Sequence, residues 1–116
     1  MKIRITENTL RIRLSNSDLI DLSSLKPVTV SLPIGALEFA IQLQVQQSYI
    51  YGAANTTETE FDNESEIHFD HQSINISITS NKLLPWINSS EICFTTTFTN
   101  PNNHTLTVVV EKDMMG

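Results

Sequence analysis

Apolar and polar side chains alternate along most of this 116-residue chain, and no other property of the sequence limits its fold as strongly. In the clearest run, residues 37–46, apolar side chains occupy every odd position: Leu37, Phe39, Ile41, Leu43 and Val45. Successive side chains of a β-strand point to opposite faces, so this pattern predicts a strand with one buried face. The chain is therefore expected to be mainly β.

The same alternation predicts a hairpin over residues 2–14 and strands at 28–32, 67–69, 74–78, 92–98 and 106–110. Residues 15–18 offer several N-cap side chains, and Leu19, Leu22 and Leu25 follow at a spacing of three until Pro27, which predicts a short helix. A second short helix is expected over 80–90, with Pro85 tolerated only near its first turn.

Short connections between about seven strands favour an antiparallel sheet that curls over its own core or closes into a small barrel, with one or two short helices. A two-sheet sandwich is the alternative. The length is that of a single domain, residues 1–116, and neither a linker nor an internal repeat is expected.

Composition excludes several classes of protein. A single Cys cannot form an internal disulfide, and no apolar run is long enough for a membrane-spanning helix. The first residues lack the apolar stretch of a secretory signal, so a cytoplasmic location is expected. The five Asn-x-Ser/Thr sites, which begin at Asn55, Asn63, Asn75, Asn88 and Asn103, are then interpreted as products of an Asn-, Ser- and Thr-rich composition.

Charge is distributed unevenly along the chain, whose net formal charge is −6. Residues 1–14 hold four cations and one acid, a net charge of +3, whereas residues 15–116 hold three cations and twelve acids, a net charge of −9. Alternation puts the four cations on the polar face of the first hairpin: Lys2, Arg4, Arg11 and Arg13. Like charges that close together repel one another unless anionic groups lie among them.

Two explanations of these cations remain open. They could pair internally with Glu38, Glu111 and Asp113 on other strands, or they could bind an anion such as a mononucleotide or phosphorylated metabolite. A cation-lined face is also found in triphosphate-tunnel enzymes, but the analogy is weak because their Glu-x-Glu-x-Lys strand is absent here.

Other chemically suggestive residues are interpreted as structural or solvent-exposed. The acidic residues at every second position of 58–66 lack the Gly that would turn them into a cation cage, so a solvated loop is expected. His68, Asp70 and His71 have no evident third ligand, Cys93 has no nucleophile signature around it, and Trp86 is expected in the core. No metal, cofactor or catalytic residue is predicted.

Several segments together resemble a known family. They are Met1 to Ile5, Leu10 to Ser15, Asp18-Leu19, Leu22, Ser73 to Ile78, Trp86 and Val110-Glu111-Lys112-Asp113. In these segments the chain resembles a small uncharacterised family of bacterial cytoplasmic proteins, from which the acidic stretch at 58–66 and the ending Met114-Met115-Gly116 depart. The resemblance implies that one domain spans nearly the whole chain and that the protein is cytoplasmic, and it implies no particular activity.

The function expected from the sequence is a non-enzymatic binding or interaction module that presents a polar face to a small anion or a protein. The alternative is a small enzyme acting on a phosphorylated or anionic metabolite, with Arg4, Arg11 and Arg13 as a clamp and Glu38 or Glu111 as acid or base. The acidic pI of 4.8 disfavours nucleic acid. No membrane partner is expected, and homo-oligomerisation through residues 37–45 is kept as a hypothesis.

Overall fold

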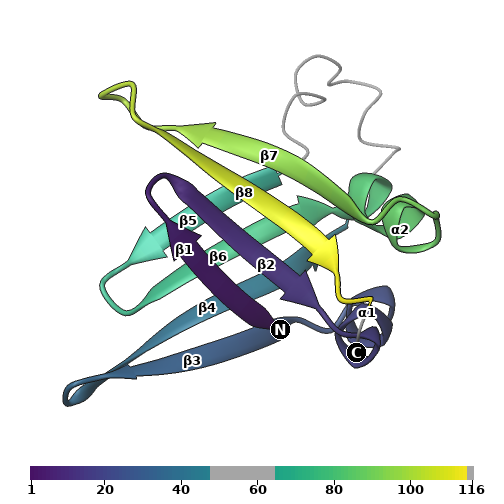
Figure 1. The fold of residues 1–116 in the computed structure, drawn as a ribbon, viewed down its shortest axis with the longest axis horizontal. Helices are drawn as coiled ribbons and strands as arrows, with labels where there is room; N and C mark the ends of the chain where they lie inside the picture. The colour runs from purple at the N-terminus through teal and green to yellow at the C-terminus, as the bar shows by residue number, and fades with distance from the viewer. Residues whose placement is uncertain (48–64, 115–116) are drawn as a thin grey trace.

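The computed structural model describes residues 1–47 and 65–114. Along the chain, the described elements are β1 (Lys2–Thr6), β2 (Thr9–Leu14), α1 (Asn16–Ser23), β3 (Val28–Ile34), β4 (Leu37–Gln46), β5 (Ser65–Asp70), β6 (Ser73–Thr79), α2 (Ser80–Ile87), β7 (Cys93–Thr99) and β8 (Thr105–Lys112). Two sheets face each other with their strands crossing, and both helices lie at one end of them (Figure 1). The expectation of a mainly β chain with two short helices is confirmed.

The strands form two four-stranded sheets, and the closed barrel of about seven strands was a wrong expectation. Sheet A has the order β1-β2-β8-β7 and sheet B the order β3-β4-β6-β5. Within the described residues no strand of one sheet pairs with a strand of the other. The alternative of two packed sheets is therefore the correct one.

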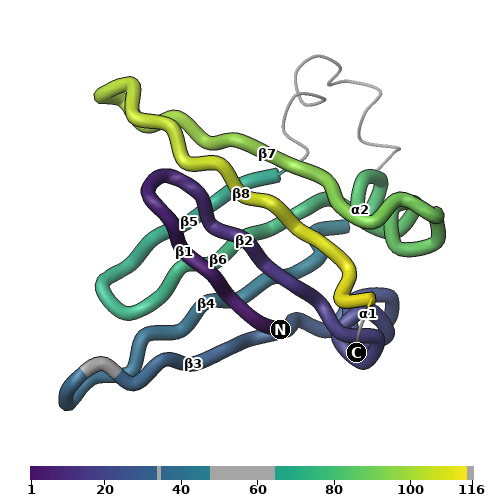
Figure 2. The backbone as a smooth tube through the Cα atoms, in the orientation of Figure 1, coloured from purple at the N-terminus to yellow at the C-terminus, as the bar shows by residue number. Residues whose placement is uncertain are grey.

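Each sheet is mixed rather than antiparallel. The four hairpins are antiparallel, but β2 pairs with β8 in parallel, and β4 pairs with β6 in parallel. The chain leaves sheet A after β2 through α1, builds sheet B, and returns through α2 to add β7 and β8 (Figure 2). Parallel neighbours require such a crossover connection, which here includes a helix.

The two halves of the chain repeat one another, so the expectation that the chain has no internal repeat was wrong. Each half has the order strand, strand, helix, strand, strand, and the first three elements of the halves match at a separation of 64 residues. Ile3 faces Ile12 in the first hairpin as Ile67 faces Ile76 in the third. Most matched side chains share their apolar character rather than their identity, as in the pairs Leu10/Ile74, Leu14/Ile78 and Leu22/Trp86.

A pseudo-twofold relationship follows from the strand pairing. Ile12 of β2 lies beside Val110 of β8, and its counterpart Ile76 of β6 lies beside Leu43 of β4. Each sheet thus takes one hairpin from each half of the chain. The two halves exchange hairpins, so neither sheet is complete without both halves.

The core lies between the sheets and against the helices. Its fully buried side chains come from the inward positions of β2, β4, β6 and β8 and from the helices: Leu10, Ile12, Leu14, Leu22, Ile41, Leu43, Ile76, Ile78, Leu83, Val108 and Val110. Within each strand, these side chains occupy the alternate positions that the sequence pattern assigned to the buried face. The four central strands therefore carry most of the hydrophobic stabilisation.

Helix α1 begins with a reciprocal capping box. Ser15 Oγ accepts a hydrogen bond from the Asp18 backbone N–H at 3.2 Å, and Asp18 Oδ2 accepts one from the Ser15 N–H at 2.9 Å. The helix ends before Leu25, which adopts a left-handed φ of 64° and is 43% exposed. The sequence prediction was right about the cap and wrong in counting Leu25 among the helical core residues.

Helix α2 buries Leu83 and Trp86 and contains Pro85 within its span, near its end rather than in its first turn. The expected position of this proline was therefore wrong. The missing N–H costs one helical hydrogen bond, and the packing of Trp86 on the core offsets this loss.

Candidate functional site

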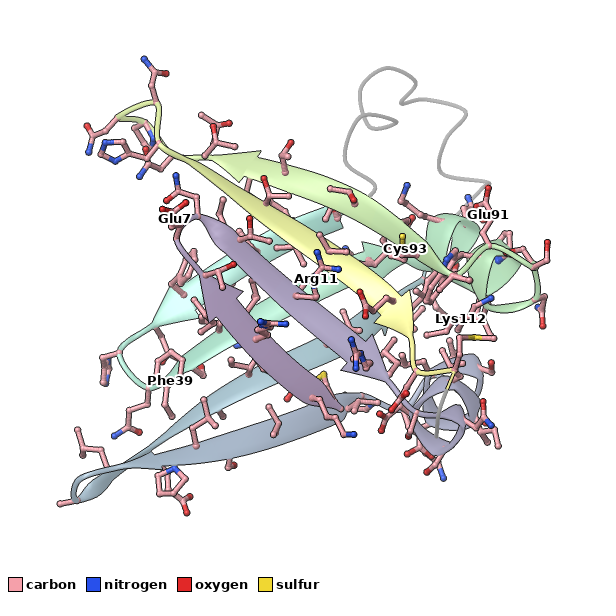
Figure 3. All side chains as sticks on the ribbon, in the orientation of Figure 1. Glu7, Arg11, Phe39, Glu91, Cys93 and Lys112 are labelled. Atoms are coloured by element: carbon pink, nitrogen blue, oxygen red, sulfur yellow. The ribbon has the colours of Figure 1, made fainter. Side chains whose placement is uncertain are left out.

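The four cations of the first hairpin lie together on the outer face of sheet A, as the alternation predicted. We call Lys2, Arg4, Arg11 and Arg13 the cationic face; all four are exposed, and Arg11 is labelled in Figure 3. The register of β1 and β2 sets Lys2 opposite Arg13 and Arg4 opposite Arg11. Each cation therefore has a like charge as its direct cross-strand neighbour, an arrangement that costs stability unless anions intervene.

Glu111 of β8 supplies one such anion. The parallel register places it beside Arg13, where Glu111 Oε2 accepts from Arg13 Nε at 3.0 Å and Glu111 Oε1 accepts from Arg11 Nη1 at 2.7 Å. Its side chain is only 13% exposed. The hydrogen bond from Arg11 is the main reason that the pKa of Glu111 is lowered, since burial acts in the opposite direction and Arg13 adds to the lowering.

The remaining two cations, Lys2 and Arg4, differ from the arginines that contact Glu111. Lys2 Nζ lies 3.7 Å from Asp113 Oδ2, and the Lys2 side chain is 78% exposed. Arg4 forms no ion pair with any residue that the structure describes. Arg4 and Lys2 thus border a shallow depression of about 120 Å³ that is also lined by Arg11 and Arg13.

Glu38 does not contribute to this face. It lies on β4 of sheet B, opposite Pro33 of β3 and on the outward side of that sheet. Alternation could assign Glu38 to an outward face, but it could not tell to which of the two sheets that face belongs. Of the three predicted charge partners, the structure brings Glu111 and Asp113 to the cationic face and leaves Glu38 elsewhere.

Sequence reasoning missed an ion pair beneath the same hairpin. The amino group of Met1 lies 2.7 Å from Asp18 Oδ2, and the Asp18 side chain is 13% exposed. Burial raises the pKa of Asp18, but hydrogen bonds from the Met1 amino group and from Ser15 outweigh it, so the pKa is lowered overall. Ser15 and Asp18 were both among the predicted N-cap residues, whereas the proximity of the chain's first residue was not predicted.

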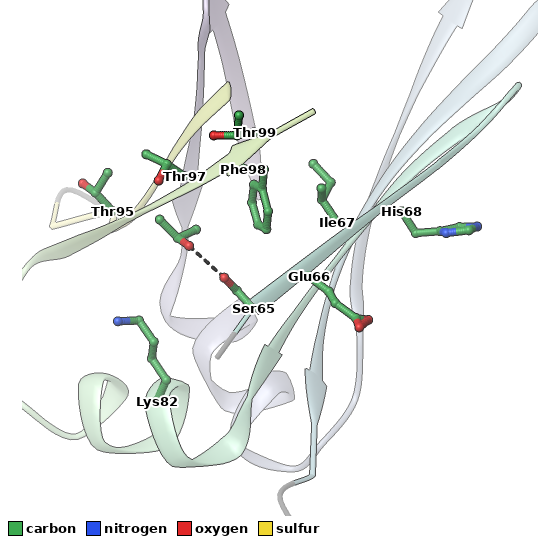
Figure 4. A pocket seen from close by; sticks show the side chains of 10 residues that line it. Ser65, Glu66, Ile67, His68, Lys82, Thr95, Thr97, Phe98 and Thr99 are labelled. Carbon is green, nitrogen blue, oxygen red and sulfur yellow. Dashed lines mark hydrogen bonds between the residues drawn. The ribbon is translucent and has the colours of Figure 1, made fainter. Parts of the chain in front are cut away.

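A second concave region lies between the edge strands of the two sheets. This polar cleft, of about 750 Å³, lies between β5 and β7 and includes Ser65, Lys82, Thr95 and Thr97 (Figure 4). At one point Ser65 Oγ and Thr96 Oγ1 approach to 2.7 Å and join the two sheets. Thr96 thereby connects the edges without any backbone pairing between β5 and β7.

The other residues of chemical interest do not assemble into a reactive cluster. Residues 1–47 and 65–114 contain no group of three or more His, Cys, Asp or Glu side chains that could hold a metal. Cys93 is a free thiol exposed on sheet A, while Trp86 lies in the core and forms an edge-to-face contact with Phe94 at 4.9 Å. The core position predicted for Trp86 is confirmed.

Some predictions fall outside the described residues. These are the acidic stretch up to residue 64 and the glycan-acceptor sequences at Asn55 and Asn63. Of the described helices, neither has the length and apolarity needed to cross a lipid bilayer.

No curated protein and no solved structure matches the chain. A family model does match, and it covers residues 1–115. This match agrees with the resemblance found in the strand patterns, and it extends over both halves of the pseudo-twofold fold. The chain belongs to the Family of unknown function (DUF7009).

Proposed function

We propose that this protein is a non-enzymatic binding module whose cationic face holds a phosphate-bearing small ligand. The observation that carries the proposal is the excess of positive charge, because within the described residues the four cations meet only two carboxylates, Glu111 and Asp113. Arg4 has no ion-pair partner among the described residues and lies opposite Arg11. An anion between these two guanidinium groups would remove their repulsion and accept paired N–H bonds from both.

The size of the depression supports a small anionic group. Its volume of about 120 Å³ equals that of about four water molecules, at roughly 30 Å³ each. A phosphate group fits such a space, and the rest of the ligand would lie on the open surface of sheet A. An abundant supply of phosphorylated metabolites is found in the cytoplasm, which is the compartment we propose.

Neither of the two carboxylates expected to act as acid or base in the alternative enzymatic function is suited to that role. Glu38 lies on the outer side of the other sheet. Glu111 is bonded to two arginines, and its lowered pKa keeps the carboxylate ionised near neutral pH. A general base or acid works best with a pKa near the working pH, so binding without chemistry is the function that these contacts support.

An NMR titration of the ¹⁵N-labelled protein tests the proposal. Pyrophosphate, AMP and inorganic phosphate are added in turn, at low and at physiological salt. We expect shifts confined to β1 and β2, with an affinity that falls as salt screens the charges. Arg4→Gln should weaken binding about tenfold. Lys26→Gln, which removes one exposed positive charge that does not line the depression, should leave the affinity unchanged.

Two results would overturn the proposal. One is the absence of binding for all three phosphate compounds at low salt. The other is an equal loss of affinity in Arg4→Gln and Lys26→Gln, which would mean that only the overall charge matters.

A further inference from the structure

A second, chemically opposite site lies on the inner side of the sheets. A cavity of about 390 Å³ opens between the hairpin tips β1–β2, β5–β6 and β7–β8, at the end of the molecule away from the helices (Figure 1). Most of its wall is made of inward-facing apolar side chains, which we call the apolar mouth: Ile5, Leu10, Ile67, Phe69, Ile74, Phe98 and Leu106. It shares no residue with the cationic face.

The rim of the apolar mouth is exposed even though its residues occupy core-facing positions. Ile5 and Phe69 are 60% and 57% exposed, whereas Leu10 at the base of the cavity is 2% exposed. Ile5 and Phe69 are also counterparts in the two halves, 64 residues apart. The exposure of this position is therefore shared by the two halves of the chain. An uncovered apolar surface that lines a concave space is typical of a ligand site.

The size of the cavity limits the occupant. At roughly 30 Å³ per water molecule, it holds about thirteen waters, or a molecule of about a dozen heavy atoms. A flat protein surface could cover Ile5 and Phe69, but it could not fill the space down to Leu10. The cavity therefore suits a small molecule with an apolar chain.

The polar residues at the rim limit the head group. They are Glu7, Asn8, Thr99, Asn100, His104 and Thr105, and among the residues that the structure describes the wall includes no Lys or Arg. A fatty-acid carboxylate would meet the like charge of Glu7 and find no cation, whereas a hydroxyl or amide can form hydrogen bonds with the Asn and Thr side chains. We infer that the apolar mouth binds an uncharged medium-chain aliphatic molecule with a hydroxyl or amide head.

The test uses 1-octanol and sodium octanoate as probes with the whole chain at pH 8. Binding is followed by ¹H–¹⁵N NMR and by the shift in melting temperature. We expect 1-octanol to bind, to perturb residues of the apolar mouth and to raise the melting temperature, and octanoate to bind about tenfold more weakly. Glu7→Gln should reduce this discrimination, since it removes the repelling charge and keeps the shape of the side chain.

Variants at the rim separate ligand binding from folding. Phe69→Asn should abolish binding of 1-octanol with little loss of stability, because Phe69 is largely exposed in the free protein. Leu37→Asn is the matched control, since Leu37 is 60% exposed and lies at the β3–β4 hairpin outside the cavity. Arg4→Gln should also leave octanol binding unchanged, which keeps this inference separate from the proposed phosphate site.

Three results would overturn the inference. The first is the absence of a bound state with 1-octanol, and the second is equal affinity for octanoate. The third is a wild-type dimer in light scattering that Phe69→Asn converts to a monomer, because a second copy would then be the natural cover of this surface.

Discussion

Ile12 and Ile76 occupy equivalent positions in the two halves of the chain, and both are completely buried. Ile12 lies on β2 beside Val110 of β8, and Ile76 lies on β6 beside Leu43 of β4. In both cases the second strand of one half pairs with the last strand of the other half. If the pseudo-twofold relationship governs packing as well as topology, their side chains have comparable surroundings.

The first prediction concerns this pair. Ile12→Ala and Ile76→Ala should each lower the free energy of unfolding by about 2–5 kcal/mol, and the two losses should agree within about 1 kcal/mol. Urea denaturation measures both. A loss confined to one variant would mean that the repeat is topological only.

The second prediction concerns the pairing of Glu111 with Arg11 and Arg13. Glu111→Gln should lower the free energy of unfolding by about 1–2 kcal/mol, because it removes the anion that separates two guanidinium groups. A double-mutant cycle with Arg11→Met isolates the pairwise coupling. Additive losses in that cycle would show that the ion pair seen in the structure contributes nothing measurable.

The third prediction concerns pH. Asp18 and Glu111 have lowered pKa values in the folded protein, so the unfolded chain binds more protons than the folded one at acidic pH. Their stabilising effect is complete above their ordinary values of 3.8 and 4.5, and it is lost as the pH falls through the lowered values. Urea midpoints measured from pH 6 downward should therefore decrease below about pH 4.5.

A matched variant assigns this pH dependence. Glu111→Gln should flatten the decrease, since a glutamine does not titrate in this range. Glu91→Gln is the control, because Glu91 is exposed and forms no ion pair within the described residues. If both variants retain the full decrease, Glu111 is not one of its sources.

The fourth prediction concerns Lys112, which fixes the end of α2. Its Nζ donates to the carbonyl oxygens of Trp86 at 3.0 Å and Ser89 at 2.8 Å, and it lies 4.8 Å from the Trp86 ring centroid. Lys112→Met should cost about 1–3 kcal/mol and shift the emission of Trp86, the only tryptophan. Lys26→Met provides the control for loss of charge alone, and an equal cost in the two variants would contradict the prediction.

The fifth prediction separates ligand binding from stability on the cationic face. Arg4→Thr should leave the stability of the free protein unchanged or raise it by up to about 1 kcal/mol, because Arg4 lies opposite Arg11 and has no ion pair in the described chain. Thermal melts with and without pyrophosphate check this. A large destabilisation without ligand would make Arg4 a structural residue.

Local patterns predicted the strands and the cap of α1 because their causes are local. The alternation through Leu10, Ile12 and Leu14 reflects burial of one face, and the Ser15 and Asp18 side chains reach only the first turn of their helix. The same alternation placed all four cations on one face. These features depend on residues that are near one another in the chain.

The sheet topology, the repeat and the apolar mouth were not predicted, because they depend on contacts between residues far apart in the chain. Alternation could not show that β2 pairs with β8 in parallel, so it did not distinguish a barrel from two mixed sheets or place Glu38. The repeat was hidden because the two halves conserve burial rather than identity, as in Leu22 and Trp86. The apolar mouth was equally hidden, since Ile5 and Phe69 have the sequence pattern of ordinary core residues.

Because β2 pairs in parallel with β8, sheet A cannot be completed until β8 has been synthesised. Arg13 is bonded to Glu111 across 98 positions of sequence. During synthesis the first hairpin therefore leaves the ribosome with one edge of β2 unpaired, and that edge stays unpaired until β8 has emerged. The polar side of this hairpin is strongly charged because it carries Lys2, Arg4, Arg11 and Arg13. This positive charge opposes association of the hairpin with other nascent chains.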